Sequence, residues 1–292
     1  MRWKSSAIAL ILTLFLFSCT TTTNQKPSAE SDIITEQILP KSAAKRVVAL
    51  SSLSADIISH LDPNKLVGIT GSSLFKNDSR FKDIPRVSEG QNAPNLEKIV
   101  SLKPDLVIGA AGFSDVPLQK LKQLKIPTLS TKINSWKSLE ELTKTLAKKI
   151  DVDPQPLLTS YKKLLPEQQN QTSSTLILVS RQPILTPNKN SWAGDLMSKF
   201  GAKNIAAELQ GNSPIGGYVT LSAEKVLEAN PEVLIVVNAE PRLLDSLKKE
   251  PFWQKLRATK NNRVYVFDYY GLVNPGSIDA IEKTCQELKK IL

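Results

Sequence analysis

The sequence has few of the side chains that build metal sites and covalent catalytic machinery. Its 292 residues include only two cysteines, Cys19 and Cys285, and one histidine, His60. A zinc site made of four thiolates, of two thiolates with two imidazoles, or of three imidazoles therefore cannot form within one chain. Glycine-rich phosphate-binding motifs and the Gly-x-Ser-x-Gly motif of hydrolases are also missing. We expect no resident metal, no cofactor and no enzymatic activity.

An apolar run long enough to cross a membrane permanently is missing as well. The stretch from Ala7 to Phe17 has 11 residues, whereas a spanning helix needs ~20. It follows two positive residues and precedes Ser18 and Cys19, which is typical of an export signal. We therefore predict a signal peptide over 1–18. The small residue before Cys19 resembles the processing site of bacterial lipoproteins, in which this cysteine is acylated.

The rest of the chain has an ordinary globular composition, with 41% hydrophobic and 23% charged residues. Residues 19–44 begin with a polar stretch and are expected to form a flexible tether. The net charge is +10, and loss of two positive residues with the signal peptide leaves +8. Lysines on predicted helices account for this charge, and no basic motif with interleaved aromatic residues indicates nucleic acid. Cys285 lies in a helical pattern and is expected to be buried and unpaired.

After the tether, apolar runs alternate with amphipathic helical segments. The predicted strands are 46–50, 66–69, 106–108, 126–129, 175–179, 233–237 and 264–267. Ser54 and Ser138 are predicted to cap helices, and the helical segments 139–150 and 154–165 separate the two halves of the pattern. Such alternation favours an α/β fold, with parallel sheets covered by helices.

One pattern occurs twice, at a constant spacing of 127 residues. The segment 96–108 aligns without gaps to 223–235, and both copies share Glu, Lys, Pro and a final Ile at matching positions. Each copy reads as a helix, a turn that contains proline, and a buried strand. We interpret the repeat as two related lobes. Ligands of open α/β sheets bind in the crevice at the carboxyl ends of the strands.

The run Pro94–Ile108 and its second copy resemble the substrate-binding proteins of ATP-binding-cassette importers. The resemblance is narrower to the class that serves ferric siderophores and cobalamin, class III of the periplasmic binding proteins. Supporting segments are Arg46–Leu50, Leu66–Ile69, Gly194–Leu196, Phe200–Asn204 and Arg263–Asp268. It covers about 45–292. It implies two Rossmann-like lobes with parallel sheets, joined by a single long helix, with a ligand cleft between them.

The expected divisions follow from the resemblance and from the signal peptide. They are a signal peptide at 1–18, a tether at 19–44, an N-terminal lobe at 45–133, a helical connection at 134–170 and a C-terminal lobe at 171–292. We expect an extracytoplasmic monomer, in the periplasm or at the cell surface, that only its lipid at Cys19 holds to the membrane.

The resemblance also implies a protein partner, the permease subunits of the importer. Glu97 and Glu224 match glutamates that meet arginines on the two membrane subunits in this family. Carboxylates far apart on two lobes would fix the orientation of the protein on its permease. As an alternative, each glutamate only stabilises the first turn of a helix through the helix dipole.

Candidate ligand contacts lie at predicted strand ends and in the loops that follow. They are Ser72, Phe75, Asn92, Arg181, Trp192, Tyr218, Tyr269 and Tyr270. Arg181 would place a cation in the cleft for the oxygens of a ferric chelate, or it is an ordinary surface residue. Tyr218 matches a cleft tryptophan of the cobalamin-binding relative, but Gln91 and Ala110 replace two other cleft aromatics.

A ferric siderophore or a similar iron chelate is therefore the expected ligand. Cobalamin is the alternative within the same class. A second alternative is a lipoprotein that uses this fold for sensing or docking without transport.

Overall fold

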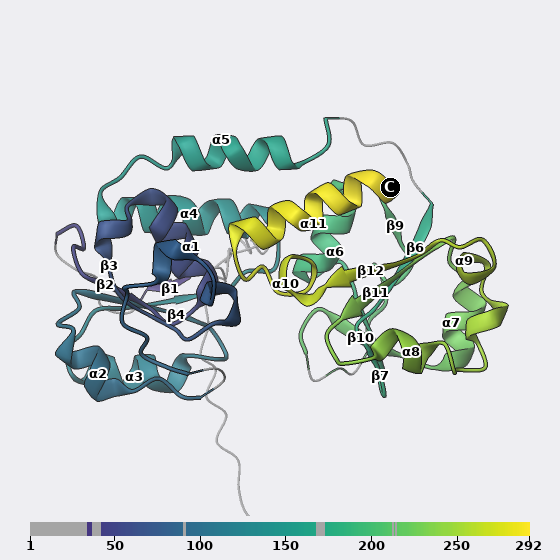
Figure 1. Cartoon of the computed structure of the whole chain (residues 1–292), viewed down its shortest axis with the longest axis horizontal. Coiled ribbons are helices and arrows are strands. Elements are labelled where there is room, and N and C mark those ends of the chain that lie inside the picture. The colour runs from purple at the N-terminus through teal and green to yellow at the C-terminus, as the bar shows by residue number, and fades with distance from the viewer. Residues whose placement is uncertain (1–33, 37–41, 90–91, 168–172, 212, 214) are drawn as a thin grey trace, which may run out of the picture. The chain divides into compact units, whose positions relative to one another are not determined.

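The computed structural model of the chain describes residues 34–36, 42–89, 92–167, 173–211, 213 and 215–292 (Figure 1). All of them belong to one compact unit, Asp32–Leu292. The predicted signal peptide, Cys19, Gln91 and most of the predicted tether lie outside the described residues. Within the described ranges, no helix combines the length and the apolar character that a membrane crossing requires.

The first lobe is built on a five-stranded sheet. Its strands are β1 (Ile34–Glu36), β2 (Val47–Ala49), β3 (Leu66–Ile69), β4 (Leu106–Ala110) and β5 (Thr128–Thr131), in the order β1-β5-β4-β2-β3. Only β1 runs antiparallel to its neighbour. The helical elements of this lobe are α1 (Ser52–Leu61), η1 (Pro63–Lys65), η2 (Ser73–Phe75), η3 (Ser79–Phe81), α2 (Leu96–Ser101) and α3 (Asp115–Gln123).

The second lobe contains a four-stranded parallel sheet and a smaller antiparallel one. The parallel sheet has the order β12-β11-β6-β9, from β6 (Ser174–Leu178), β9 (Lys203–Asn204), β11 (Val233–Asn238) and β12 (Val264–Asp268). The antiparallel sheet consists of β7 (Ser180–Arg181), β8 (Ile184–Pro187) and β10 (Tyr218–Leu221). The helical elements are α6 (Trp192–Lys199), α7 (Ala223–Ala229), α8 (Leu243–Leu247), η4 (Trp253–Lys255), α9 (Arg257–Lys260), α10 (Tyr269–Leu272) and α11 (Ile278–Ile291). The predicted α/β fold with two lobes and parallel sheets is confirmed.

The sequence repeat corresponds to a structural repeat. The strand order β3-β2-β4-β5 of the first lobe has the same topology as β9-β6-β11-β12 of the second. After α2 and α7 the chain turns through matching residues with positive φ, Lys103 at 48° and Asn230 at 36°. The matching acids then bind the first parallel strand of their own lobe. Asp105 accepts N–H groups of Lys45 and Arg46, and Glu232 accepts the N–H group of Ser174.

Two helices connect the lobes, in agreement with the predicted helical segments 139–150 and 154–165, whereas the single long helix that the resemblance implies is not found among the described residues. α4 (Trp136–Ile150) ends at Asp151, where a φ of 60° and a ψ of 56° turn the chain out of the helix. α5 (Gln155–Leu164) starts after Pro154. A residue in the left-handed conformation is a common helix end. The connection is therefore a helical hairpin.

Two predicted N-caps are three residues too late, for a shared reason. Ser51, not Ser54, caps α1. Ser135 caps α4, and its hydroxyl accepts the Ser138 N–H group while the Ser138 hydroxyl accepts the Ser135 N–H group. Because each helix has one serine at the cap and another three residues later, the sequence alone does not say which serine is the cap.

α4 joins the two lobes through its first turn. The N–H group of Trp136 donates to the carboxylate of Asp195 on α6 at 2.7 Å. The ring of Trp136 stacks on that of Trp192, with centroids 6.0 Å apart. One hydrophobic cluster includes strands of both sheets together with α4 and α5. The lobes therefore share a core instead of meeting only through a linker.

A second junction ties α11 of the second lobe to α1 of the first. The carboxylate of Asp56 on α1 is fully buried and accepts the N–H group of Ile278 at 2.6 Å. A guanidinium nitrogen of Arg80 lies 3.0 Å from that carboxylate, and another lies 3.0 Å from the carboxylate of Asp279. Burial raises the pKa of Asp56, while the Ile278 N–H group, His60 and Arg80 act in the opposite direction. We call Asp56, Arg80, Ile278 and Asp279 the interlobe latch.

Replacing Asp56 by alanine should strongly destabilise the protein. The change leaves the Ile278 N–H group without its acceptor and Arg80 without its buried partner, so we expect a loss of about 2–4 kcal/mol in the free energy of unfolding. Urea titration measures it. As the control, Lys225→Ala breaks the exposed pair of Lys225 with Glu228 and should cost no more than about 0.5 kcal/mol. Equal losses in the two variants would contradict the role of the latch.

Candidate functional site

Four of the predicted ligand contacts lie close together around α10. Tyr269 and Tyr270 begin this helix, and their rings meet edge to face with centroids 5.5 Å apart. The pKa of Tyr218 is raised, first by burial and then by nearby Tyr269. The indole N–H group of Trp192 donates to the carbonyl of Gly271 at 2.7 Å. We call Tyr218, Tyr269 and Tyr270 the tyrosine cluster.

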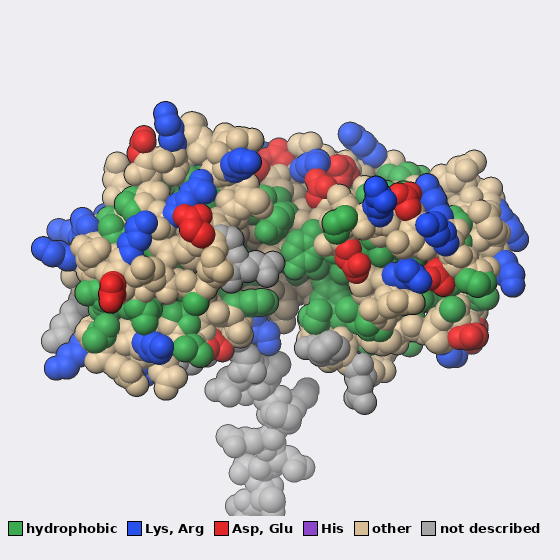
Figure 2. Space-filling view, turned by 60° about the horizontal axis from the view of Figure 1, so that its bottom comes forward, with side chains coloured by type: hydrophobic (Ala, Val, Ile, Leu, Met, Phe, Trp, Pro, Cys, Tyr) green, Lys and Arg blue, Asp and Glu red, His purple; other side chains and the backbone are tan. Residues whose placement is uncertain are grey.

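Two glycines shape the chain that carries this cluster. Gly271 has a φ of 98°, and a Cβ atom there would lie 2.2 Å from the carbonyl oxygen of Ala280. At Gly276, a Cβ atom would lie 2.6 Å from the Tyr270 ring and 2.7 Å from Leu74 of η2. Because Tyr270 and Leu74 flank the same glycine, the tyrosine cluster adjoins the first lobe. In Figure 2 hydrophobic side chains gather where the two lobes meet.

Two other predicted contacts belong to the core in this structure. Phe75 is 2% exposed, and its ring centroid lies 4.1 Å from that of Phe81. Trp192 is 3% exposed and stacks on Trp136. Phe75 is the last residue of η2, and Trp192 lies next to the segment of the tyrosine cluster. A ligand would touch either side chain only after displacing its neighbours.

The remaining predicted contacts lie on separate loops. Arg181 on β7 donates through its Nε atom to a carboxylate oxygen of Glu250 at 2.5 Å, so its charge is paired within the second lobe. Ser72 caps η2 by accepting the N–H group of Leu74 at 3.3 Å. Asn92 is exposed in the loop before α2. Of these three, Ser72 lies nearest in sequence to the contact between η2 and Tyr270.

Sequence reasoning missed Leu74, Gly271 and Gly276. The stretch from Gly271 to Gly276 includes Asn274 and Pro275. Glycines beside Asn-Pro signal a sharp turn, and this signal could have placed Tyr270 in a turn that folds back on itself. The partner on the other lobe, Leu74, has no comparable signal.

The two repeat glutamates occupy equivalent and exposed places. Glu97 and Glu224 are each the second residue of a helix, after N-caps Asn95 and Ser222. The pKa of Glu224 is lowered by hydrogen bonds to its own N–H group and to Ser222. Each helix precedes a parallel strand of its own lobe, β4 after α2 and β11 after α7, so the two carboxylates hold matching places in the two copies of the repeat.

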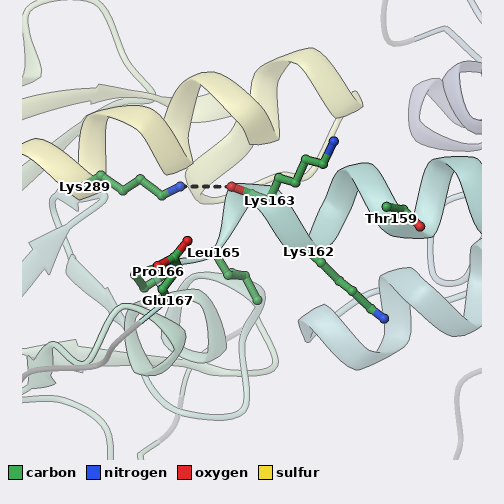
Figure 3. A pocket seen from close by; sticks show the side chains of 7 residues that line it. All are labelled: Thr159, Lys162, Lys163, Leu165, Pro166, Glu167 and Lys289. Carbon is green, nitrogen blue, oxygen red and sulfur yellow. Dashed lines mark hydrogen bonds between the residues drawn. The ribbon is translucent and has the colours of Figure 1, made fainter.

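A hollow of about 660 Å³ lies elsewhere, between the end of α5 and α11 (Figure 3). It is lined by Thr159, Lys162, Lys163, Leu165, Pro166, Glu167 and Lys289. Figure 3 shows Lys289 directed to the carbonyl of Lys163, with a distance of 3.1 Å, and Lys162 directed away from it. No predicted ligand contact lines this hollow. Among the residues that the structure describes, no group of three His, Cys, Asp or Glu is placed to hold a metal ion.

Comparison with known proteins gives a family match over most of the chain. The model of a family described as periplasmic binding protein matches residues 47–153 and 157–270. A relative from Bacillus subtilis, the iron-uptake system-binding protein, is 30% identical over 227 residues, which is 70% of this chain and 68% of that protein. A second Bacillus subtilis relative, an uncharacterized ABC transporter substrate-binding lipoprotein, YvrC, is 26% identical and covers 83% of this chain and 78% of its own length.

Similarity extends to a vitamin B12-binding protein of Vibrio cholerae. That relative is 26% identical over 269 residues, which is 88% of this chain and 94% of the relative. A crystal structure of such a Vibrio cholerae protein covers 87% of this chain and 99% of its own, with a TM-score of 0.59 and 23% identity. This structural likeness supports the class III fold.

Replacing Gly271 by alanine should destabilise the turn of the tyrosine cluster. The new methyl group would meet the backbone at Ala280, and the positive φ is unfavourable for alanine. We expect a loss of about 2–4 kcal/mol in the free energy of unfolding, measured by urea titration. Gly216→Ala, at a position with nothing within 4 Å, is the control and should change stability by less than about 0.5 kcal/mol. A tolerated Gly271→Ala would contradict this turn geometry.

Proposed function

The chain belongs to the periplasmic binding protein family, and on that premise we propose that it captures a ferric siderophore or a similar iron chelate between its two lobes and delivers it to a permease. Its general role is that of an ABC transporter substrate-binding protein. Members of this family bind their cargo for transport and carry out no chemistry on it. The proposal names the ligand, the residues that contact it and the residues that dock on the permease.

The tyrosine cluster is the observation that carries the ligand proposal. Siderophores and ferric carboxylates present many oxygen atoms on a bulky body. Phenol hydroxyls donate to and accept from such oxygens, and their rings offer apolar contact. The 30% identity to an iron-uptake system-binding protein supports an iron chelate. With one histidine in the chain, the iron would arrive with its own chelator.

The proposed contacts come from both lobes. Tyr269 and Tyr270 would face the ligand from the second lobe, and the more buried Tyr218 lies near Tyr269. Ser72 and Asn92 would contribute from the first lobe. Arg181 would take part only after its pair with Glu250 opens, and Phe75 and Trp192 would support the site from the core. Cys19 is the proposed lipid attachment site, and the similarity to the lipoprotein YvrC is consistent with it.

Cobalamin is the second candidate, because a vitamin B12-binding protein matches 88% of the chain. A corrin needs a wide apolar and aromatic surface. In the proposed site the aromatic contacts come mainly from one lobe, which favours the smaller and more polar chelate.

Titration against a ligand panel separates these candidates. The panel contains ferric hydroxamates, ferric catecholates, ferric citrate and cobalamin, and quenching of intrinsic fluorescence reports binding. We expect saturable binding of a ferric chelate and a loss of about tenfold or more in affinity for Tyr269→Ala/Tyr270→Ala, because each ring contributes of the order of 1 kcal/mol. Tyr265→Ala, on β12, is the matched tyrosine control. Saturable binding of cobalamin alone would overturn the ligand assignment.

The proposal that the protein docks on a permease is based on the equivalent positions of Glu97 and Glu224 in the two lobes. Both carboxylates are exposed, and each is the second residue of the helix that begins its copy of the repeat. Arginines on the two permease subunits would pair with them in a defined geometry.

Reversing both charges should separate docking from binding. Glu97→Lys/Glu224→Lys should abolish uptake of the bound ligand in cells while leaving its affinity for the purified protein unchanged. Glu282→Lys, at an exposed position of α11, is the control and should retain uptake. If the double variant still supports uptake, the two glutamates act only as first-turn residues of their helices.

A further inference from the structure

Among the described residues, most of the exposed large apolar side chains lie in one segment of the first lobe. Within the described residues, seven large hydrophobic side chains are exposed, and four of them lie between 100 and 124. They are Val100 on α2, Phe113 before α3, Val116 on α3 and Leu124 after it. We call these four residues the α2–α3 face. Figure 2 shows hydrophobic and basic side chains close together over this part of the molecule, at the lower left.

Phe113 is the most exposed of them, and its loop is held firmly. Its side chain is 91% exposed. Gly112, with a φ of 82°, turns the chain outward before it, and the Gly112 N–H group donates to the carboxylate of Asp115 at 3.0 Å. The N–H groups of Phe113 and Ser114 both donate to the carbonyl of Ala110. The backbone therefore presents the ring to the outside in a fixed position.

Exposed lysines occur in the same segment as these apolar side chains. The exposed lysines of the same segment are Lys98, Lys103, Lys120, Lys122 and Lys125. The acids of the segment are Glu97, Asp105 and Asp115, and the last two accept backbone N–H groups. The face is thus apolar with an excess of positive charge.

The chain enters the first lobe beside this face. In the sheet, Ile34 of β1 pairs with Thr131 of β5, which pairs with Ala110 of β4. Phe113 follows Ala110 by three residues. The 14 residues between Cys19 and Ile34 reach at most about 50 Å when fully extended. A lipid at Cys19 would therefore keep this end of the first lobe close to the membrane.

We propose that the α2–α3 face binds the surface of an anionic phospholipid membrane, with Phe113 and Val116 entering the interface and the lysines contacting the headgroups. Apolar side chains that enter the headgroup region and nearby lysines act together in this mode of binding. It adds a second membrane contact to the predicted lipid and requires neither the ligand nor the permease.

Vesicle binding tests the proposal without either of those partners. The protein is the mature chain, residues 19–292, with Cys19→Ser so that no acyl chain contributes. We expect it to bind vesicles that contain phosphatidylglycerol, to bind pure phosphatidylcholine more weakly, and to dissociate as salt rises. Phe113→Ser/Val116→Ser should bind about tenfold more weakly, because two apolar side chains no longer leave water. Leu209→Ser/Ile215→Ser removes two exposed apolar side chains from the second lobe and should bind like the parent.

A spectroscopic variant locates the contact. Trp136, Trp192 and Trp253 are all buried, so the indole introduced by Phe113→Trp would be the exposed one among the described residues. Brominated phosphatidylglycerol vesicles should quench that added emission.

Equal binding of the serine double variant and the parent, or no quenching at position 113, would overturn the proposal. Lost permease docking with unchanged vesicle binding would also overturn it and assign the face to a protein partner. Unchanged urea midpoints of the variants verify their folding.

Discussion

The arrangement of the two lobes depends on a buried carboxylate. Asp56 lies inside the first lobe, yet it accepts the first N–H group of the last helix, which continues from the second lobe. A helix begins with N–H groups that have no partner within the helix, and burying one without an acceptor is costly. The chain satisfies it with a side chain 222 residues away. Because Arg80 reaches both Asp56 and Asp279, separating the lobes here would break the contact of Arg80 with Asp279 and leave the Ile278 N–H group without its acceptor.

This constraint also fixes the candidate site. The tyrosine cluster stands on a short segment between β12 and α11, and both ends of that segment are held. Trp192 binds the carbonyl of Gly271, and Asp56 binds the N–H group of Ile278. Side chains on such a segment lose little freedom when a ligand arrives, which favours affinity. The shared core across α4 acts in the same direction, because large rearrangement of the lobes would break its packing.

The sequence predicts much of the fold because its signals are local. The repeat at a spacing of 127 residues gives the two lobes, and even the acids Asp105 and Glu232 take equivalent roles. The site is less predictable because it depends on partners distant in sequence. Arg181 follows a strand as expected, but Glu250 pairs with it. Phe75 follows a strand as well, but Phe81, six residues later, covers its ring. The periodicity of apolar residues in the sequence does not predict which side chains will pair with or cover Arg181 and Phe75.

The two lobes share one strand topology, but their surfaces differ, and this difference makes the two ends of the molecule distinguishable. Val100 on α2 is 41% exposed, whereas its counterpart Leu227 on α7 is partly buried against a cluster of the second lobe. Lys225 and Glu228 form an ion pair on α7, whereas Ser101 takes the place of Glu228 on α2. The loop with Phe113 and the entry strand β1 both belong to the first lobe. Two equivalent glutamates alone would allow either lobe to face either permease subunit. The proposed lipid tether and the proposed membrane-binding face belong to the same lobe, so together they would distinguish the two ends of the protein relative to the membrane before docking begins.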